Sequence, residues 1–429
     1  MSAIEAIKGT RDILPDEIGY WQWLEQVARS VLGRAAYCEI RTPIFEQTDL
    51  FARGIGEATD VVGKEMYTFM DKGERSVTLR PEGTAGVVRA YIENGLHVKG
   101  SLQRLWYLGP MFRYENVQAG RQRQFHQLGC EVLGSADPRA DVEVIAIAID
   151  ILTALGLTGL RLDLNSVGTP RDRQRYRAAL VDYLTPYQEK LDPDSQVRLT
   201  RNPMRILDSK HPETQKIVQD APKIWDHLDP ESQQRFEQVQ QQLTDLGIDF
   251  HLNPCLVRGL DYYTHTAFEI VAETGLGAQN AVGGGGRYDG LVAELGGSET
   301  SAVGWAMGLE RLLLLLQQAA AAPVTQLDFY VVSRGTHAEP QSLRLAQSLR
   351  HAGFSVELDL SASAFGKQFK RADRSGAAAC LILGDDEAAQ STVQLKWLGS
   401  GEQESMPQSQ LIEQATSLKA KIQSLTQRE

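Results

Sequence analysis

The sequence reads Gly109-Pro-Met-Phe-Arg113-Tyr-Glu115 and, after a polar loop, Arg121-Gln-Arg123-Gln-Phe125-His-Gln127-Leu-Gly129-Cys-Glu131. Both arms and their flanks are rich in leucine, valine and aromatic residues, which predicts a hairpin of two long strands over residues 102–133 with a loop over 116–122. Successive side chains of a strand point to opposite faces, so the odd-numbered residues of both arms share one face. The other face is apolar and carries Trp106, Leu108, Phe112, Leu128 and Val132. The pattern therefore predicts one core face and one polar face.

The polar face of this hairpin carries glycines at positions 109 and 129, which keep the surface low. A ligand could lie on such a floor with Arg113 and Glu131 at different points along it. A solvated sheet face with cross-strand ion pairs fits the same alternation equally well. The hairpin alone leaves both interpretations open.

The length and charge of the chain limit the classes of function. A chain of 429 residues exceeds the size of one ordinary hydrophobic core and predicts roughly two to three domains. The 44 Lys and Arg against 55 Asp and Glu give a net charge of -11, so any contact with nucleic acid must be local. No signal peptide or membrane-spanning stretch is visible, and the four cysteines lack metal-binding spacing. These features predict a cytoplasmic protein.

The pattern outside the hairpin predicts a helix over 21–31, short strands at 66–70 and 76–80, and a helix over 142–155. Residues 170–246 contain no glycine and are rich in Arg, Gln and Leu, which predicts an inserted helical region. Further strands are predicted at 250–257 and 262–271. An alanine-rich linker ends at Pro323, and alternating strands and helices beyond it predict a separate α/β domain.

The stretch Leu79-Arg80-Pro81-Glu82-Gly83-Thr84 lies at the end of a predicted strand. Pro81 favours an extended Arg80, Gly83 permits a turn, and Thr84 is a suitable cap for the following helix. Glu82 would then be held rigidly. A simple turn pair between Glu82 and Arg80 is the alternative for this stretch taken alone.

Three further stretches carry residues suited to chemistry. They are Leu256-Val-Arg258-Gly-Leu-Asp-Tyr262-Tyr263-Thr264, Val282-Gly-Gly-Gly-Gly-Arg-Tyr288-Asp-Gly290 and Ser301-Ala-Val-Gly304-Trp-Ala-Met-Gly308-Leu-Glu-Arg311. The glycine run lacks the lysine of a P-loop and the spacing of a dinucleotide fingerprint. Taken alone, the tyrosines are ordinary strand aromatics and Arg311 is an edge residue of a leucine-rich helix.

The hairpin resembles motif 2 of the class II aminoacyl-tRNA synthetases, and its Phe-Arg-x-Glu and Gly-Arg-x-Arg-Gln-Phe-His-Gln sequences resemble the histidyl-tRNA synthetases in particular. The stretches at 256–264 and 282–290 resemble the two histidine-specific blocks of that family, and 301–311 resembles motif 3. The likeness covers nearly the whole chain. It implies an α+β catalytic domain with a mainly antiparallel sheet over residues 1–325, a helical insertion at about 170–246, and a C-terminal α/β anticodon-binding domain over 326–429.

The resemblance also implies roles for individual residues. Arg113 and Arg258 would be catalytic, because they would offset the charge that develops when the carboxylate of histidine attacks the α-phosphate of ATP. The set implied to bind histidine is Glu82, Thr84, Gln127, Glu131, Arg258, Tyr262, Tyr263 and Tyr288. The set implied to bind ATP is Arg113, Glu115, Arg121, Arg123, Phe125 and Arg311.

By the same resemblance, the protein would activate L-histidine with ATP and transfer it to the 3′ end of tRNA(His). Mg²⁺ bridging the phosphates is implied, with Glu115 or another acid near it, although no metal ligand set can be read from the sequence. Motif 1, around Pro43, implies a homodimer. Basic runs at 171–177 and 198–210 would contact the acceptor stem, while a solvated helix face is the commoner role of such runs. The basic stretch at 365–373 resembles a helix of the anticodon-binding domain.

The chain departs from the family in three places. Tyr114-Glu-Asn-Val117 replaces the usual His-Glu-Arg-Pro, Gln122 replaces a usual tyrosine, and the run of four glycines differs slightly. The first change removes a positive charge from the loop that would meet the acceptor end. A different class of function is a catalytically silent paralogue, similar to the histidine-sensing regulatory subunit of ATP phosphoribosyltransferase. The presence of Arg258 and of residues 326–429 argues against it.

Overall fold

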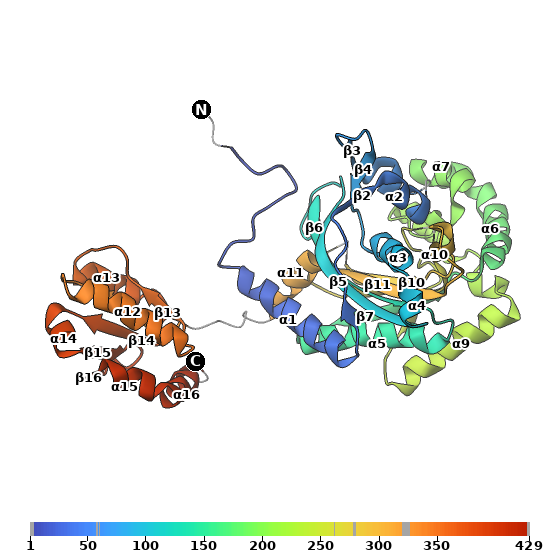
Figure 1. Ribbon diagram of the computed structural model, residues 1–429. Helices are drawn as coiled ribbons and strands as arrows, with labels where there is room; N and C mark the ends of the chain where they lie inside the picture. Colours follow the sequence, from blue (N-terminus) through green and yellow to red (C-terminus); the bar gives the residue numbers. More distant parts are fainter. Residues whose placement is uncertain are drawn as a thin grey trace. The chain divides into compact units, whose positions relative to one another are not determined.

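A computed structural model describes residues 4–56, 59, 61–260, 262–277, 280–319 and 327–426. The chain divides into two compact units, Met1–Pro323 and Val324–Glu429. Each unit is built around its own main sheet (Figure 1). The predicted linker and the predicted boundary at 325/326 involve residues 320–326, which lie outside the described residues.

Unit 1 contains a sheet of eight strands. Their bounds are β1 (Cys38–Glu39), β5 (Gln103–Phe112), β6 (Gln124–Leu133), β7 (Leu160–Ser166), β8 (His251–Leu252), β9 (Thr264–Ala272), β10 (Ala281–Arg287) and β11 (Ala302–Gly308). The order across the sheet is β1-β5-β6-β11-β10-β9-β7-β8. Neighbours from β5 to β7 pair antiparallel, and only the edge strands β1 and β8 pair parallel. This mainly antiparallel sheet confirms the predicted fold class.

Strands β5 and β6 form the predicted long hairpin. Trp106, Leu128 and Val132 belong to one buried cluster, whereas Tyr107 and Met111 belong to another. The two clusters lie on opposite faces of the hairpin, so the division of the residues between two faces is confirmed. The odd-numbered face, predicted to be polar, is also packed in a buried apolar cluster.

Helices cover both faces of the sheet. One face packs against α1 (Ile18–Arg34), α5 (Pro138–Ala154), α9 (Pro230–Asp245) and α11 (Leu309–Ala319). The other packs against α3 (Thr84–Glu93) and α10 (Leu291–Glu294), and Figure 1 shows α3 and α5 on opposite sides of the sheet. Helix α5 begins four residues before the predicted start at 142, because the side chain of Asp137 accepts the Arg139 amide and Pro138 occupies the first helical position.

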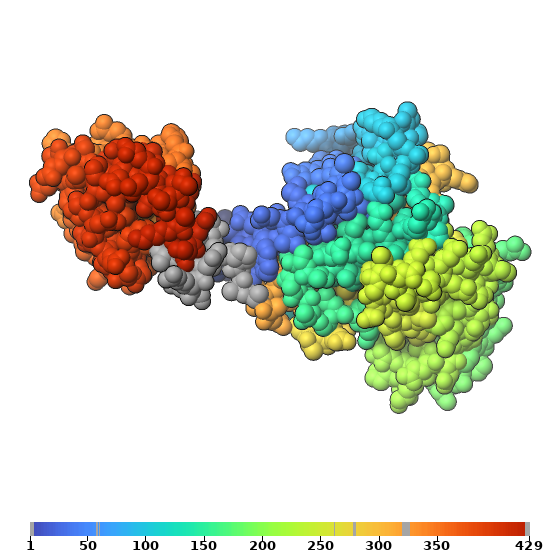
Figure 2. All heavy atoms as spheres, turned by 90° about the horizontal axis from the view of Figure 1, so that it is seen from below, coloured from blue at the N-terminus to red at the C-terminus, as the bar shows by residue number. Residues whose placement is uncertain are grey.

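The predicted helical insertion is confirmed. It comprises α6 (Pro170–Leu184), α7 (Pro193–Arg201), α8 (Pro212–Gln219) and α9, with short turns η2 (Thr185–Lys190), η3 (Pro203–Ile206) and η4 (Ile224–His227). Three of these helices share one start signal, in which the side chain of Thr169, Asp192 or Asp229 caps the helix and a proline follows. In Figure 2 the green and yellow-green insertion forms one contiguous mass within unit 1.

A second, three-stranded antiparallel sheet is formed by β2 (Phe45–Gln47), β4 (Ser76–Leu79) and β3 (Tyr67–Met70). It contains the predicted hairpin of strands at 66–70 and 76–80. The remaining elements of unit 1 are α2 (Thr48–Ile55), η1 (Val61–Glu65) and α4 (Leu96–Lys99).

One strand prediction is wrong. Residues 250–257 contain only the two-residue strand β8, because the side chain of Asn253 accepts the Cys255 amide at 3.1 Å and Pro254 cannot donate to a neighbouring strand. The chain turns there, and Arg258 lies on a loop between β8 and β9.

Unit 2 has the α/β architecture predicted from the sequence. Its strands are β12 (Phe329–Ser333), β13 (Val356–Leu358), β14 (Ala379–Leu383), β15 (Thr392–Trp397) and β16 (Gln403–Pro407), in the order β13-β12-β14-β15-β16. Its helices are α12 (Ala338–His351), α13 (Phe365–Ala372), α14 (Asp385–Gln390), α15 (Gln408–Glu413) and α16 (Ala415–Thr426). Across the described part of the chain, we find no helix that is both long and apolar enough to cross a membrane.

Candidate active site

Six residues predicted to bind histidine come together beside the central strands of unit 1. We call this group the Glu131 cluster: Glu82, Thr84, Glu131, Tyr262, Tyr263 and Tyr288. At its centre, Thr84 Oγ1 donates to Glu131 Oε1 and the Tyr288 hydroxyl donates to Glu131 Oε2, each at 2.6 Å. The Tyr262 ring centroid lies 4.8 Å from that of Tyr263 and 5.6 Å from that of Tyr288. The fold thus gathers residues from four separate stretches around one carboxylate.

The turn before α3 differs from its prediction. Thr84 does not cap the helix with its side chain; instead the carboxylate of Glu82 accepts the backbone amides of Thr84 at 2.6 Å and Ala85 at 2.8 Å. A carboxylate satisfies these free amides well and is favoured at a helix N-terminus. The hydroxyl of Thr84 is therefore available to Glu131. Arg80 donates to the carbonyls of Thr42 and Pro110, and these contacts account for its position without a turn pair.

Glycines allow the side chains of the cluster to approach the strands closely. A Cβ atom on Gly304 would lie 1.7 Å from Glu131 Oε2, and one on Gly129 would lie 2.0 Å from the ring of Tyr107. Tyr107 also covers Gly83, where a Cβ would lie 2.2 Å from the same ring. The low floor predicted from the glycines is therefore covered largely by the protein's own side chains.

Burial controls the charge of the two acids. It raises the pKa of Glu131 to about 8, although the hydrogen bonds from Thr84 and Tyr288 act in the opposite direction. Burial also raises the pKa of Glu82, which exposes only 4% of its surface. Glu131 consequently holds a proton for much of the time at pH 7.

The residues predicted to bind ATP form a second group, the Arg113 cluster: Arg113, Glu115, Arg121, Arg123, Phe125 and Arg311. Glu115 Oε1 lies 3.7 Å from Arg113 Nη1, and its other oxygen pairs with Arg121. The guanidinium carbon of Arg113 lies 5.3 Å from the centre of the Phe125 ring. Arg113 Nε donates to the carbonyl of Pro81 at 2.7 Å, so two different nitrogens of its guanidinium group face acceptors, the Pro81 carbonyl and Glu115.

Two further arginines complete this group. The guanidinium carbon of Arg123 lies 3.7 Å from the centre of the Tyr114 ring. Arg311, in the first turn of α11, donates to the carbonyl of Ala281 at 2.5 Å, and a Cβ on Gly120 would lie 3.0 Å from its Cγ. Burial and the charge of Arg121 lower the pKa of Arg311. Four arginines and one carboxylate in one place suit a ligand with several phosphates.

Arg258 contacts the Glu131 cluster directly and is linked to the Arg113 cluster through Glu269. Its Nη1 donates to Glu269 Oε1 at 2.8 Å, and its guanidinium carbon lies 5.7 Å from the Tyr263 ring centre. Glu269 also acts electrostatically on Arg311. A Cβ on Gly284 would lie 2.7 Å from Arg258 Nη1, so the glycine run of β10 makes room for this arginine.

Gln127, the remaining predicted histidine-binding residue, lies on β6 opposite Gly308 of β11. Its side-chain oxygen is buried and has no hydrogen-bond partner among the described residues. A buried acceptor normally has a partner, so this oxygen is suited to a ligand.

The site also contains residues that sequence reasoning missed. Glu269 holds Arg258, and Glu310 accepts the His126 amide at 2.9 Å and lies 3.0 Å from His126 Nδ1. Tyr107 fills the space over two glycines. A lone acid in the apolar strand β9 was the signal that could have pointed to Glu269.

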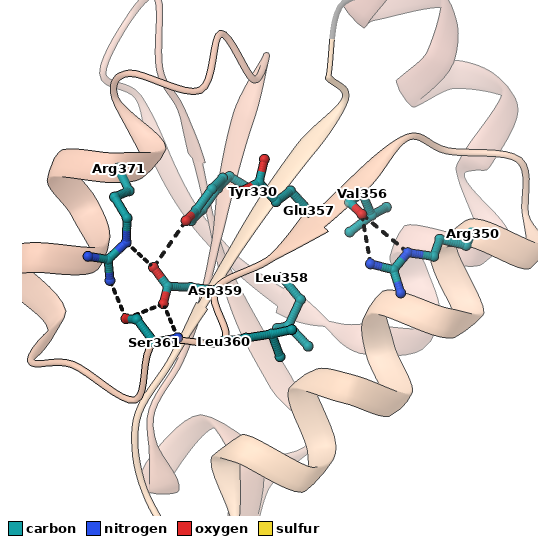
Figure 3. Close-up of a pocket in the computed structure, with 9 residues that line it drawn as sticks. All are labelled: Tyr330, Arg350, Val356, Glu357, Leu358, Asp359, Leu360, Ser361 and Arg371. Atoms are coloured by element: carbon teal, nitrogen blue, oxygen red, sulfur yellow. Dashed lines mark hydrogen bonds and ion pairs between the residues drawn. The ribbon is translucent and has the colours of Figure 1, made fainter. Parts of the chain in front are cut away.

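Unit 2 has an open cavity of about 570 Å³ that contains none of the predicted site residues. Figure 3 shows Asp359 between Tyr330 and Arg371 in this cavity. The Asp359 carboxylate accepts the Tyr330 hydroxyl at 3.0 Å and Arg371 Nε at 2.8 Å. The polar groups of Asp359, Tyr330 and Arg371 in this cavity are therefore hydrogen-bonded to one another.

An antiparallel sheet carrying a motif 2 hairpin and a motif 3 arginine defines the catalytic domain of a class II aminoacyl-tRNA synthetase. The family model for histidyl-tRNA synthetase matches residues 9–312, and that for the anticodon binding domain matches residues 328–418. The chain belongs to the histidyl-tRNA synthetase family.

Relatives agree with this assignment along the full chain. A histidine–tRNA ligase of Synechococcus elongatus is 69% identical over 423 residues, covering 99% of this chain and 97% of the relative. One of Synechocystis sp. is 69% identical over 422 residues, covering 98% and 94%. The structure of apo S. aureus histidyl-tRNA synthetase is 40% identical with a TM-score of 0.80, covering 96% of this chain and 99% of that one. These matches favour the synthetase over the regulatory-subunit alternative.

Proposed function

We propose that this protein joins L-histidine to tRNA(His) at the expense of ATP. In the first step the carboxylate of histidine attacks the α-phosphate, forming histidyl-adenylate and releasing pyrophosphate. In the second, a hydroxyl at the 3′ end of the tRNA attacks the histidyl carbonyl and AMP leaves. The observation that carries the proposal is the position of Arg258. It lies over the ring of Tyr263 in the Glu131 cluster and is held by Glu269, whose charge also acts on Arg311 of the Arg113 cluster.

The Glu131 cluster would bind histidine. Glu82 keeps acceptor capacity beyond its two backbone amides, so it can also receive the α-ammonium group, together with Thr84. Glu131 and Tyr263 would contact the two ring nitrogens, with Tyr262 and Tyr288 forming walls. The set implied to bind histidine remains Glu82, Thr84, Gln127, Glu131, Arg258, Tyr262, Tyr263 and Tyr288. An analogue without one ring nitrogen would leave a buried polar group unpaired, which would give selectivity without editing.

The reaction needs positioned positive charge rather than acid–base catalysis. Arg113 is anchored to the Pro81 carbonyl and Arg258 to Glu269, so both guanidinium groups are oriented before ATP binds. They would offset the negative charge that builds on the oxygens of the α-phosphate in the transition state.

The Arg113 cluster would bind ATP, with adenine between Phe125 and Arg311 and phosphates near Arg121 and Arg123. Mg²⁺ fits this arrangement, because Glu115 supplies a carboxylate beside the arginines and the phosphates supply further oxygens. The described residues contain no group of three or more acids, histidines or cysteines placed to hold a metal on their own. Bound Mg²⁺ would neutralise phosphate charge.

Residues 326–429 would bind the anticodon and the insertion at 170–246 the acceptor stem. The match of residues 328–418 to the anticodon binding domain supports the first role. We also propose a cytoplasmic homodimer. Exposed apolar side chains beside motif 1, among them Phe45 (53% exposed), Phe69 (48%) and Met70 (62%), support a subunit contact there. Sedimentation of an active monomer would contradict it.

Pyrophosphate exchange into ATP, measured with each amino acid in turn, tests the proposed function. Exchange should depend on histidine and on no other amino acid. Exchange without an amino acid requirement, or with a different amino acid, would refute the proposal. Charging of tRNA(His) with radioactive histidine then tests the second step.

A further inference from the structure

Two arginines of the insertion point inward, to the loop between β8 and β9. Arg173 on α6 donates to the backbone carbonyl of Tyr263. Arg205 in η3 donates to the backbone carbonyl of Arg258 at 3.3 Å. From the sequence, both belong to basic runs expected to face RNA. Their contacts instead hold the loop that carries three residues of the proposed active site, Arg258, Tyr262 and Tyr263.

A third arginine of the insertion enters a buried ionic network. Arg235 on α9 donates to Asp141 Oδ2 at 3.0 Å, and Arg287 at the end of β10 donates to both oxygens of the same carboxylate. Asp141 and Arg287 are fully buried. Arg287 also donates to Asp289 at 3.0 Å and to the carbonyl of Ser135 at 2.8 Å. Two cations and two anions balance, so loss of one leaves an uncompensated buried charge.

This network fixes the position of Tyr288 from both sides. Arg287 precedes it and Asp289 follows it in the chain, and both are members of the network. The Tyr288 amide donates to the carbonyl of Ala302 at 2.8 Å, while Asp289 Oδ1 accepts the Ala302 amide at 3.0 Å. The hydroxyl of Tyr288 then reaches Glu131 at 2.6 Å. Arg235 is thus connected to the Glu131 cluster by a chain of contacts.

We propose that the helical insertion is a positioning element for the first step of the reaction. Its positioning residues are Arg173, Arg205 and Arg235, which lie on three different elements of the insertion and hold the segments carrying Tyr263, Arg258 and Tyr288. The inference rests on the proposed function. It assigns to the insertion a role in histidine activation that needs no RNA.

The insertion also supplies matched controls. Arg171 and Arg201 are exposed arginines on α6 and α7. Variants at these positions change the same residue type in the same region without touching the inward contacts. Exchange of pyrophosphate requires no tRNA, so it separates positioning from RNA binding.

The experiment compares Arg235→Met and Arg205→Met with Arg171→Met in the full chain. Arg235→Met should raise the KM for histidine about tenfold and leave the KM for ATP unchanged, because Tyr288 and Glu131 contact only histidine. Arg205→Met should lower kcat for exchange about tenfold, because it releases the backbone of Arg258. Arg171→Met should leave all exchange constants at wild-type values. Arg235→Lys and Arg205→Lys, which keep the charge, should recover most of the loss.

Thermal unfolding of every variant checks folding. Arg235→Gln and Arg205→Gln, which also remove the charge and should show the same losses, replace any methionine variant that does not fold. Folded Arg235 and Arg205 variants with wild-type constants, beside a wild-type protein that exchanges with histidine, would overturn this inference alone. Equal changes in the KM values for histidine and ATP in Arg235→Met would also overturn it. A wild-type protein without histidine-dependent exchange would refute the proposed function instead.

Discussion

Glu131 is almost completely buried, and its carboxyl group accepts hydrogen bonds from two neighbouring hydroxyl groups. The side chain exposes 1% of its surface, and Thr84 and Tyr288 both donate to it. Burial outweighs these donors and lifts the pKa from 4.5 to about 8. The folded protein therefore binds more protons than the unfolded chain between these two values, and the free energy of unfolding falls as pH rises through that window.

Glu131→Gln removes this titration while keeping the size of the side chain. The stability of the wild-type protein relative to the variant should fall by roughly 1.4 kcal/mol per pH unit between about pH 5 and pH 8, and should level off above. Urea unfolding of both proteins across this range provides the measurement. Parallel stability curves for the two proteins would show that Glu131 titrates at its ordinary pKa.

Arg258 is proposed to offset the charge that develops on the α-phosphate in the first step. Arg258→Ala should lower kcat for exchange by about 10²–10³-fold, whereas the KM for ATP should change less than about threefold. The kcat of Arg258→Lys should lie between those of the wild-type protein and Arg258→Ala, because lysine keeps the charge but lacks the planar guanidinium group with its several donors. Initial rates at varied ATP give both constants, and equal losses in kcat and ATP affinity would refute a transition-state role.

Among the secondary-structure elements, β10 and β11 carry glycines at positions where side chains of the site lie directly against the strand backbone. Gly304 and Gly308 belong to the same strand, β11, and differ in their surroundings. The Glu131 carboxylate occupies the space over Gly304, while a Cβ on Gly308 would meet nothing within 4 Å. The strand therefore offers a matched pair of positions.

Gly304→Ala should destabilise the protein by about 2–3 kcal/mol and raise the KM for histidine strongly, because the new methyl group displaces Glu131. Gly308→Ala should change both quantities little. Chemical denaturation and exchange kinetics of the two variants make the comparison. If Gly304→Ala and Gly308→Ala had the same stability and the same KM for histidine, the Glu131 side chain could move aside without a loss of stability or of histidine binding.

Elements with a local signal were predictable from the sequence, and contacts over long distances were not. The alternation around Trp106 is a pattern that spans only a few residues. The same is true of the starts of the insertion helices, where a capping Thr or Asp is followed by proline. The failure of the strand at 250–257 is also local, since Asn253-Pro254 is a turn signal that the apolar pattern concealed. The hydrogen bond from Thr84 to Glu131 joins residues 47 positions apart in the chain, and no local pattern indicates it. The inward direction of Arg205 likewise depends on tertiary packing.

At the scale of the whole molecule, the two compact units match two separate family models. The residues proposed for activation all belong to unit 1. Unit 2 carries the amphipathic helix α13, whose Lys367 and Lys370 are exposed while Gln368 is buried. The division of the chain therefore suggests that changes on α13 affect the use of tRNA and not the activation of histidine.

The double variant Lys367→Ala/Lys370→Ala tests this division of labour. The KM for tRNA(His) in charging should rise several-fold and its dependence on salt should weaken, because two cations near phosphates are lost. Exchange of pyrophosphate should stay at the wild-type rate. Lys421→Ala serves as a control that also removes positive charge from unit 2. Lys421 is an exposed lysine on α16 that packs on the Trp397 ring at 3.9 Å, and its loss should leave the KM for tRNA unchanged. A loss of exchange activity in the double variant would show that α13 affects the active site, and an unchanged KM for tRNA would remove α13 from the RNA contact.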